Sequence, residues 1–159
     1  MVMNINMKGW KVDSTIPPYF LGEQGENNAN ILSIFVADDD IIEEDASHVN
    51  VKYSINIKDK EIDESVISKT KELTIVKETT ETQKVDDEGN PMYDDQDNPI
   101  MESETKTYLQ TRMTSDWLGK SALKLLQVQL QYTDLTDSEN PIDVVIKSNV
   151  FNAIVHDSV

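Results

Sequence analysis

The strongest pattern in the sequence is a two-residue alternation of apolar and polar positions, which is the spacing of a β-strand with one buried face. It is clearest in residues 51–58, where every second residue is valine, tyrosine or isoleucine. It returns in residues 126–132, where leucine, valine and tyrosine alternate with three glutamines. Both segments are predicted to be half-buried antiparallel strands.

Other segments have strand composition with less regular alternation. Residues 30–37 are rich in β-branched and aromatic side chains, and residues 71–85 begin as a strand and fade into a polar Thr/Glu pattern. The closing segment, residues 142–159, predicts one or two more strands, with Phe151, Ala153 and Val155 on one face. One helical turn is expected after Ser115 as the N-cap residue, ending at Gly119.

Five to eight strands, with at most one helical turn, predict an all-β fold. We expect an antiparallel β-sandwich, immunoglobulin-like or jelly-roll-like, formed as a single domain by residues 26–159. The polar Thr/Glu segment and its return strand predict a protruding acidic β-ribbon, inserted at residues 77–108.

The first 25 residues are predicted to form an extended N-terminal arm. Pro17 and Pro18 enforce extended geometry and exclude a continuous helix. The aromatic residues Trp10, Tyr19 and Phe20 need a surface on which to be buried. Two alternatives remain open: the arm packs on its own domain, or it lies across a neighbouring subunit.

Charge is the most unusual property of this chain of 159 residues, which has a formal net charge of −16. Residues 77–104 hold ten acidic and two basic residues, and residues 38–45 hold six acidic residues and no basic one. Nucleic acid and anionic membrane surfaces are therefore disfavoured as partners, because both require clustered Lys and Arg. The rest of the chain is nearly neutral, which indicates an ordinary domain with two acidic outgrowths.

Targeting signals and cysteine chemistry are both missing from the sequence. There is no cysteine, the N-terminus lacks the pattern of a signal peptide, and no apolar run is long enough to span a membrane. We expect a soluble protein made in a cytoplasm.

The segment DDEGNPMYDDQDNPIM, residues 86–101, contains the same motif twice, eight residues apart. Its dense carboxylates suggest a calcium loop, for which the candidate ligands are Asp86, Glu88, Asn90, Asp94 and Asp97. The sixth position of each copy, however, is proline, where a calcium loop of the EF-hand type requires glycine. The alternative is structural, because Asp and Asn followed by Gly or Pro form turns.

As a double turn, the repeat would be a charged ribbon with too little apolar surface to form its own core. It would then lie in solvent or against a partner. The predicted partner contacts are the apolar residues of the repeat and of the N-terminal arm: Met92, Tyr93, Ile100, Trp10, Pro17, Pro18, Tyr19 and Phe20.

No catalytic constellation is recognisable in the sequence. His48 and His156 are too far apart to suggest a ligand set and are expected to be solvated. No serine lies in a nucleophile elbow, and no glycine-rich phosphate loop is present. We therefore expect a protein that is not an enzyme and carries no cofactor.

Residues 26–40, ENNANILSIFVADDD, and residues 122–159 stand at the two ends of the predicted domain. They are similar, respectively, to the opening strand and to the closing hairpin of the N-terminal domain of phage upper baseplate (BppU-type) proteins. The closing motif is matched by Ser148, Phe151, Val155, Ser158 and Val159, and WLGK at residues 117–120 occupies the place of a short turn before that hairpin.

The resemblance implies a virion component that attaches other virion parts and has no catalytic residue. Proteins of that family usually continue into helical stalks, whereas no heptads are present here, which favours an adaptor or anchoring subunit of the tail, baseplate or fibre attachment region. Its partners would be other virion proteins and copies of itself. A capsid decoration or head-fibre protein, and a calcium-dependent binding module, are the alternatives.

Overall fold

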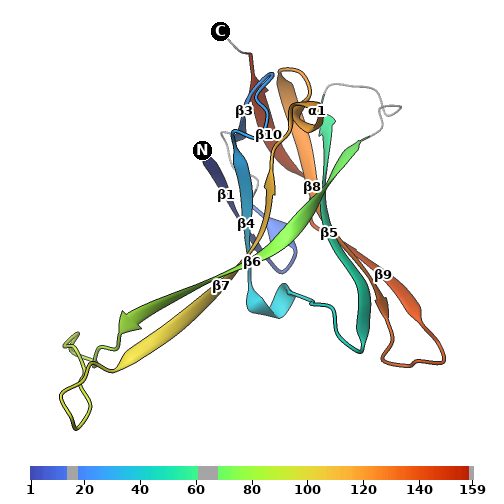
Figure 1. The fold of residues 1–159 in the computed structure, drawn as a ribbon. Helices are drawn as coiled ribbons and strands as arrows, with labels where there is room; N and C mark the ends of the chain where they lie inside the picture. Colours follow the sequence, from blue (N-terminus) through green and yellow to red (C-terminus); the bar gives the residue numbers. More distant parts are fainter. Residues whose placement is uncertain (14–17, 61–67, 158–159) are drawn as a thin grey trace.

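The computed structural model describes residues 1–13, 18–60 and 68–157, and these residues form an all-β fold (Figure 1). Ten strands are present in this described part, together with one 3₁₀ turn, η1 (Asp38–Asp40), and one helical turn, α1 (Ser115–Leu118). The strands are β1 (Val2–Lys8), β2 (Lys11–Val12), β3 (Tyr19–Glu23), β4 (Ile31–Val36), β5 (His48–Asp59), β6 (Lys69–Gln83), β7 (Met101–Arg112), β8 (Ala122–Asp134), β9 (Ile142–Lys147) and β10 (Phe151–His156).

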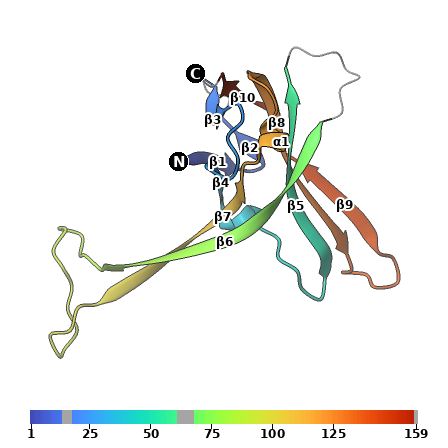
Figure 2. The ribbon, with the colours of Figure 1, turned by 45° about the horizontal axis from the view of Figure 1, so that its top comes forward.

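The strands form one mixed sheet that curls around its own core (Figures 1 and 2). The order of the strands is β2-β1-β4-β7-β6-β5-β8-β10-β3, and β9 pairs with the second half of β8. The pairs β1–β4 and β3–β10 are parallel, and the other pairs are antiparallel. The expected all-antiparallel arrangement is therefore wrong at these two pairs.

Strand β6 connects the two halves of the sheet. Its residues from Lys69 to Leu73 pair with β5, whereas its residues from Thr74 to Gln83 pair with β7. Leu73 is the last fully buried residue of β6, and beyond it Ile75 and Val76 are only half-buried. The first third of β6 thus contributes to the core, whereas the rest of the strand extends away from the body.

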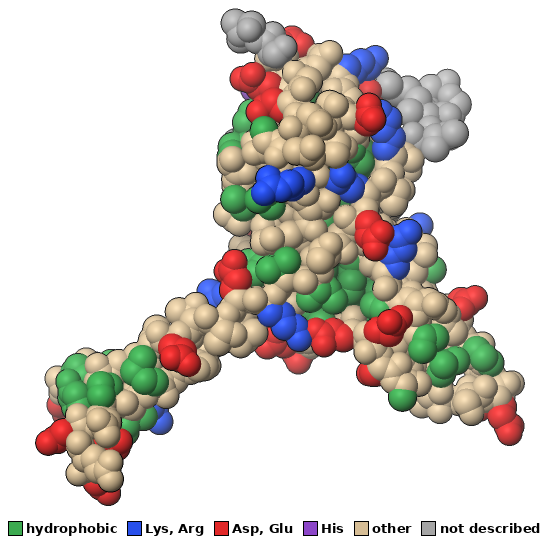
Figure 3. All heavy atoms as spheres, in the orientation of Figure 1, with side chains coloured by type: hydrophobic (Ala, Val, Ile, Leu, Met, Phe, Trp, Pro, Cys, Tyr) green, Lys and Arg blue, Asp and Glu red, His purple; other side chains and the backbone are tan. Residues whose placement is uncertain are grey.

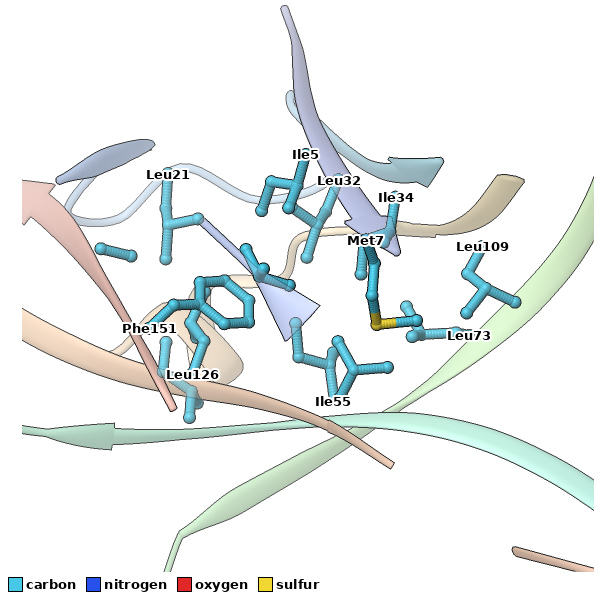
Figure 4. Close-up of a cluster of buried hydrophobic side chains, with 14 of the residues drawn as sticks. Ile5, Met7, Leu21, Leu32, Ile34, Ile55, Leu73, Leu109, Leu126 and Phe151 are labelled. Carbon is cyan, nitrogen blue, oxygen red and sulfur yellow. The ribbon is translucent and has the colours of Figure 1, made fainter. Parts of the chain in front are cut away.

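The core lies inside the curl and takes side chains from both halves of the sheet (Figure 4). Ile5, Met7, Leu32, Ile34 and Leu109 come from one half, and they face Ile55, Leu126 and Phe151 from the other. Fully burying one aliphatic side chain contributes roughly 1.5–3 kcal/mol relative to leaving it exposed. The core is therefore the main source of stability for the curled sheet.

The alternation in the sequence predicted the inward-facing residues of three strands. Tyr53, Ile55 and Ile57 of β5 are buried, and so are alternate residues of β8 and β10: Leu126, Val128, Leu130, Phe151, Ala153 and Val155. The polar face of β5 departs from the prediction at Ser54, which is also buried.

The N-terminal residues differ from the extended arm that the sequence predicted. Strand β1 pairs in parallel with β4 from Val2↔Ile31 to Met7↔Val36, and β3 pairs with β10. Ile5, Met7 and Leu21 are core residues with at most 1% exposure. The described part of residues 1–25 thus packs on its own domain, the first of the two alternatives, while Pro17 lies outside the described residues.

Thr114, not Ser115, is the N-cap of α1, and it makes no side-chain capping hydrogen bond, while Gly119 ends the turn at φ +68° as expected. The sheet is one curled layer whose halves face each other across the core, so a division into two separate sheets of immunoglobulin or jelly-roll type stays a prediction.

The acidic loop at residues 38–45 is tied to the body by Tyr53. The Tyr53 hydroxyl accepts a hydrogen bond from Ile42 N at 2.8 Å and donates one to Ile42 O at 2.9 Å, and its ring stacks on Trp10. Burial raises the pKa of Tyr53 above the usual value for a phenol. The loop therefore rests on a neutral, buried phenol.

The placement of β1 in the core can be tested by comparing two positions on that strand. We expect Ile5→Ala to lower the free energy of unfolding by about 2–5 kcal/mol, because it leaves a cavity in the core. Val2→Ala, at a side chain that is 51% exposed, should change it by about 0.5 kcal/mol or less. Urea unfolding measures both, and equal midpoints for the two variants would contradict the placement.

Candidate functional site

The most prominent surface feature is the ribbon, residues 77–108, which projects from the body away from the core (Figure 2). All residues from Lys77 to Lys106 are exposed except Gln83, Met92 and Ile100, which are half-buried. The two strands are held in register by ten Cα pairs from Thr74↔Gln110 to Gln83↔Met101. Within them Glu78 lies opposite Lys106, and the hydroxyls of Thr79 and Thr105 are 3.0 Å apart.

Beyond Gln83 the chain folds into two small hairpins, one from each copy of the repeat. In the first, Asp86 N donates to Asn90 O, and the Asp86 Oδ1 atom accepts hydrogen bonds from Glu88 N and Asn90 N, all at 2.9 Å. The second repeats this arrangement around Asp94, with bonds of 2.8–2.9 Å from Gln96 N, from Asn98 N and to Asn98 O. The repeated sequence therefore encodes a repeated turn.

Each turn requires one residue in the left-handed region. Gly89 has φ +84° in the first turn, and Asp97 has φ +60° at the matching position of the second. Glycine adopts this conformation without steric cost, and aspartate tolerates it better than most residues. The substitution of Gly by Asp between the two copies thus preserves the turn.

The two hairpins and the ribbon meet in a ring of three backbone hydrogen bonds. Lys84 N donates to Ile100 O at 2.7 Å, Ile100 N to Met92 O at 3.0 Å, and Met92 N to Lys84 O at 2.8 Å. In an ordinary hairpin Ile100 N would return to Lys84 O, but here Met92 is inserted between them. Residues 84, 92 and 100 are eight apart, so the repeat length sets the size of the ring.

Three further residue pairs flank the ring, and each joins a residue that follows one ring residue to a residue that precedes another. Val85 pairs with Pro91, Tyr93 with Pro99, and Met101 with Gln83. The backbone hydrogen bonds are made by the residues before and after each proline. Proline itself has no N–H group to donate, so its position in each pair costs no hydrogen bond. We call residues 84–101, which comprise the ring and its two hairpins, the head.

Three apolar side chains at equivalent positions of the head are exposed. Val85, Tyr93 and Met101 each follow a ring residue, and their exposures are 53%, 55% and 51%. Since successive side chains of a strand alternate in direction, these three lie on the opposite side of the backbone from Lys84, Met92 and Ile100. We call Val85, Tyr93 and Met101 the apolar trio; Figure 3 shows hydrophobic side chains gathered at the end of the ribbon.

Carboxylates are the other main component of the exposed surface of the head. The head contains six acidic residues and a single basic one, Lys84. All six carboxylates are in exposed residues: Asp86, Asp87, Glu88, Asp94, Asp95 and Asp97. An apolar centre with a charged rim is the usual composition of a protein-binding surface.

The candidate calcium ligands have structural roles in the turns, unlike the residues of a calcium loop, which bind the ion. Asp86 and Asp94 accept the turn hydrogen bonds, Asn90 lies on the return side of its hairpin, and Asp97 provides the left-handed residue. No group of three or more acidic or histidine side chains is placed to hold a metal ion within residues 1–13, 18–60 and 68–157.

The predicted partner contacts divide into two places. Met92, Tyr93 and Ile100 lie together in the head, but Trp10, Pro18, Tyr19 and Phe20 are half-buried on the body. Tyr19 packs edge-on against Phe151 with ring centroids 5.9 Å apart, and Phe20 packs against His156 at 5.0 Å. These aromatic side chains of the N-terminal segment have intramolecular contacts, whereas Tyr93 in the head is exposed.

Val85 and Met101 belong to the candidate surface but were not among the residues predicted from the sequence. Single exposed valines and methionines are common and indicate nothing by themselves. The available signal was their spacing, because residues 85, 93 and 101 share the eight-residue period of the acidic repeat.

The histidines are placed in two different settings. His48 is half-buried, its Nδ1 atom lies 2.9 Å from Asp45 Oδ1, and its ring packs on Tyr132; His156 is exposed. Hydrogen bonds from Ser47 N and from the His48 ring lower the pKa of Asp45. The expectation of a solvated His48 is therefore only partly met.

Among the helices of the described residues, none has the length and apolar character needed to cross a bilayer.

No protein-family model matches this chain, and no curated protein is significantly similar to it in sequence.

The role of the aspartates in the head can be tested by Asp86→Ala. The variant loses the acceptor of two backbone N–H groups, so the amides of Glu88 and Asn90 should exchange with solvent about tenfold faster or more. The unfolding midpoint should stay close to that of the wild type because the core is untouched. Hydrogen exchange followed by NMR measures this effect.

Asp87→Ala is the matched control, since it removes the same charge from a neighbouring residue that accepts neither turn hydrogen bond. Equal exchange rates in the two variants would show that the carboxylate of Asp86 does not hold the turn.

Proposed function

We propose that this protein is a non-enzymatic structural component of a bacteriophage virion, an adaptor or anchoring subunit of the tail, baseplate or fibre attachment region. The observation that carries the proposal is the head of the ribbon, an exposed apolar trio held away from the body on two long paired strands. Such a feature adds little to the stability of its own domain, and it suits attachment to a neighbour.

The construction of the ribbon supports an attachment role. Apolar residues of the ribbon strands reach the core only as far as Leu73 on β6 and Leu109 on β7. Beyond them the ribbon is stabilised by cross-strand pairs, by the turn hydrogen bonds of the head and by an ion pair between Lys77 and Glu43 at its base. Conformational entropy opposes an ordered ribbon of this length in isolation. Burial of the apolar trio against a partner would offset that cost.

The resemblance to the N-terminal domain of upper baseplate proteins supports the virion setting. Its opening segment corresponds to β4, and its closing segment corresponds to β8, β9 and β10, which lie in the same curled sheet. The partners proposed on this basis are other virion proteins and copies of the chain. Neither nucleic acid nor a membrane is proposed as a partner, and no cofactor is required for this role.

The alternative place within a virion is the capsid, as a decoration or head-fibre protein. Ribbon, head and curled sheet would serve equally in either position, so the fold does not choose between them. A density map of the assembled particle separates tail from capsid.

The role of the head can be tested by shortening the ribbon. Gln83 and Met101 are already Cα partners, so residues 84–100 can be replaced by an Asn-Gly turn without disturbing the register. We expect this variant to fold with an unfolding midpoint close to that of the wild type but to be lost from assembled particles. Quantitative mass spectrometry of purified particles measures its incorporation.

The matched control shortens the other projecting hairpin. Asp134 and Ile142 are also Cα partners, so residues 135–141 can be replaced by the same turn. This control should be incorporated normally. Incorporation of the shortened-ribbon variant at the level of the wild type would overturn the role of the head.

A further inference from the structure

We propose that the head of one copy docks on a lysine-lined hollow beside α1 of a second copy of this chain. The inference rests on the proposed attachment role of the head and names its partner. It follows from two surfaces of opposite charge, each with apolar residues, which the fold places at opposite ends of the molecule.

The hollow is formed where β5, β6 and β8 approach α1. It has a volume of about 320 Å³, and its apolar lining comes from Ile57, Trp117 and Leu118. Trp117 is buried, and its Nε1 atom has no hydrogen-bond partner among the described residues. The hollow thus has an apolar floor and a spare donor close to it.

Lysines line the rest of the hollow. Lys58, Lys69, Lys120 and Lys124 contribute to it, which is four of the 14 basic residues in the chain. Lys124 is buried and forms an ion pair with Asp59, the one carboxylate among the described residues that line the hollow. The three other lysines are in exposed residues, so the described lining carries a net positive charge in a protein of net charge −16.

Two of the lysines, Lys69 and Lys124, lie close to Gly119. The Lys69 Nζ atom donates to Asp116 O at 2.5 Å, which ties the start of β6 to α1. A Cβ atom added to Gly119 would lie 3.5 Å from Lys124 Nζ and 3.9 Å from Lys69 Nζ, so both ammonium groups lie around this glycine. The positive charge is therefore concentrated over one short segment of backbone.

The head has the complementary composition. Its six carboxylates would face the lysines, and the apolar trio would cover the apolar floor of the hollow. Complementary charge of this kind steers association and sets orientation, and it is weakened by salt. Since the chain contains both surfaces, no second type of subunit is needed.

The contact must be between different molecules. The head and α1 lie at opposite ends of the molecule in both views, so a head cannot reach the hollow of its own chain (Figures 1 and 2). A head-to-head contact would oppose two strongly acidic surfaces, and like charges placed against each other disfavour association. A head-to-hollow contact is heterologous, and repetition of it produces a ring or an open chain.

Sedimentation velocity of the purified full-length protein tests the contact directly. We expect concentration-dependent association at about 50 mM salt that is lost at about 500 mM, because the Debye length shortens several-fold over this range. A wild-type protein that stays monomeric at about 100 µM and low salt would overturn the proposal.

Charge reversal on each surface identifies the two sides. Asp87→Lys with Asp95→Lys changes the head without removing the turn acceptors Asp86 and Asp94, and Lys58→Glu with Lys120→Glu changes the hollow. Each double variant alone should associate at least about tenfold more weakly than the wild type. An equimolar mixture of the two variants should recover association. Recovery in the mixture is the decisive result, whereas two inactive variants that do not restore each other contradict the pairing.

Asp39→Lys with Glu139→Lys is the matched control for the head variant, since it changes net charge equally at exposed residues outside both surfaces. Association of this control should equal that of the wild type. Equal weakening in the control would mean that net charge alone governs association, which would overturn the proposal. The outcome is independent of particle incorporation, so loss of self-association with retained incorporation would leave the virion role intact.

Discussion

The structure depends on the exchange of partners by β6 between Leu73 and Thr74. Up to Leu73 this strand is bonded to β5 and contributes to the core, and from Thr74 it is bonded to β7. From there to Gln83 the backbone groups of β6 on one edge are paired by β7 and no longer by β5. The curled body with its core and the projecting ribbon are thus joined at this one exchange.

Two parallel pairs complete the sheet on either side of that junction. Strand β1 adds to β4, and β3 adds to β10 with a register shift between Ile154 and Val155, where Leu21 is the extra residue and is fully buried. Tyr19, two residues earlier, also packs against the core, so Leu21 keeps the inward face of β3, and the shift changes only which residues pair after it. Gly22 follows at φ +138°, and a Cβ atom there would lie 2.6 Å from Asn30 Nδ2, so the close approach of β3 to the segment before β4 requires glycine.

The features that could be predicted from the sequence are those with a local signal. Alternation identified the inward faces of β5, β8 and β10, and the repeated Asp-Asn-Pro motif identified the turns. Strand β1 also alternates, at Met3, Ile5 and Met7, but its partner begins about 30 residues away at Ile31, and parallel pairing over such a distance leaves no local pattern. The ion pair of Lys124 with Asp59 and the hydrogen-bonded ring of the head likewise depend on contacts between distant residues. Val85 and Met101 share the eight-residue period of Tyr93, but they were missed because the period alone does not show that their side chains are exposed.

The hydrogen-bonded ring of Lys84, Met92 and Ile100 makes the lengths of the two hairpins independent of the ribbon that carries them. Each hairpin leaves the ring and returns to it within eight residues, so residues inserted between Asp86 and Asn90 or between Asp94 and Asn98 change neither the ring nor the register of β6 and β7. Loops with closely spaced ends tolerate added length at small entropic cost. The head is thus a natural position for grafting a foreign peptide epitope, displayed far from the core and on a rigid stem.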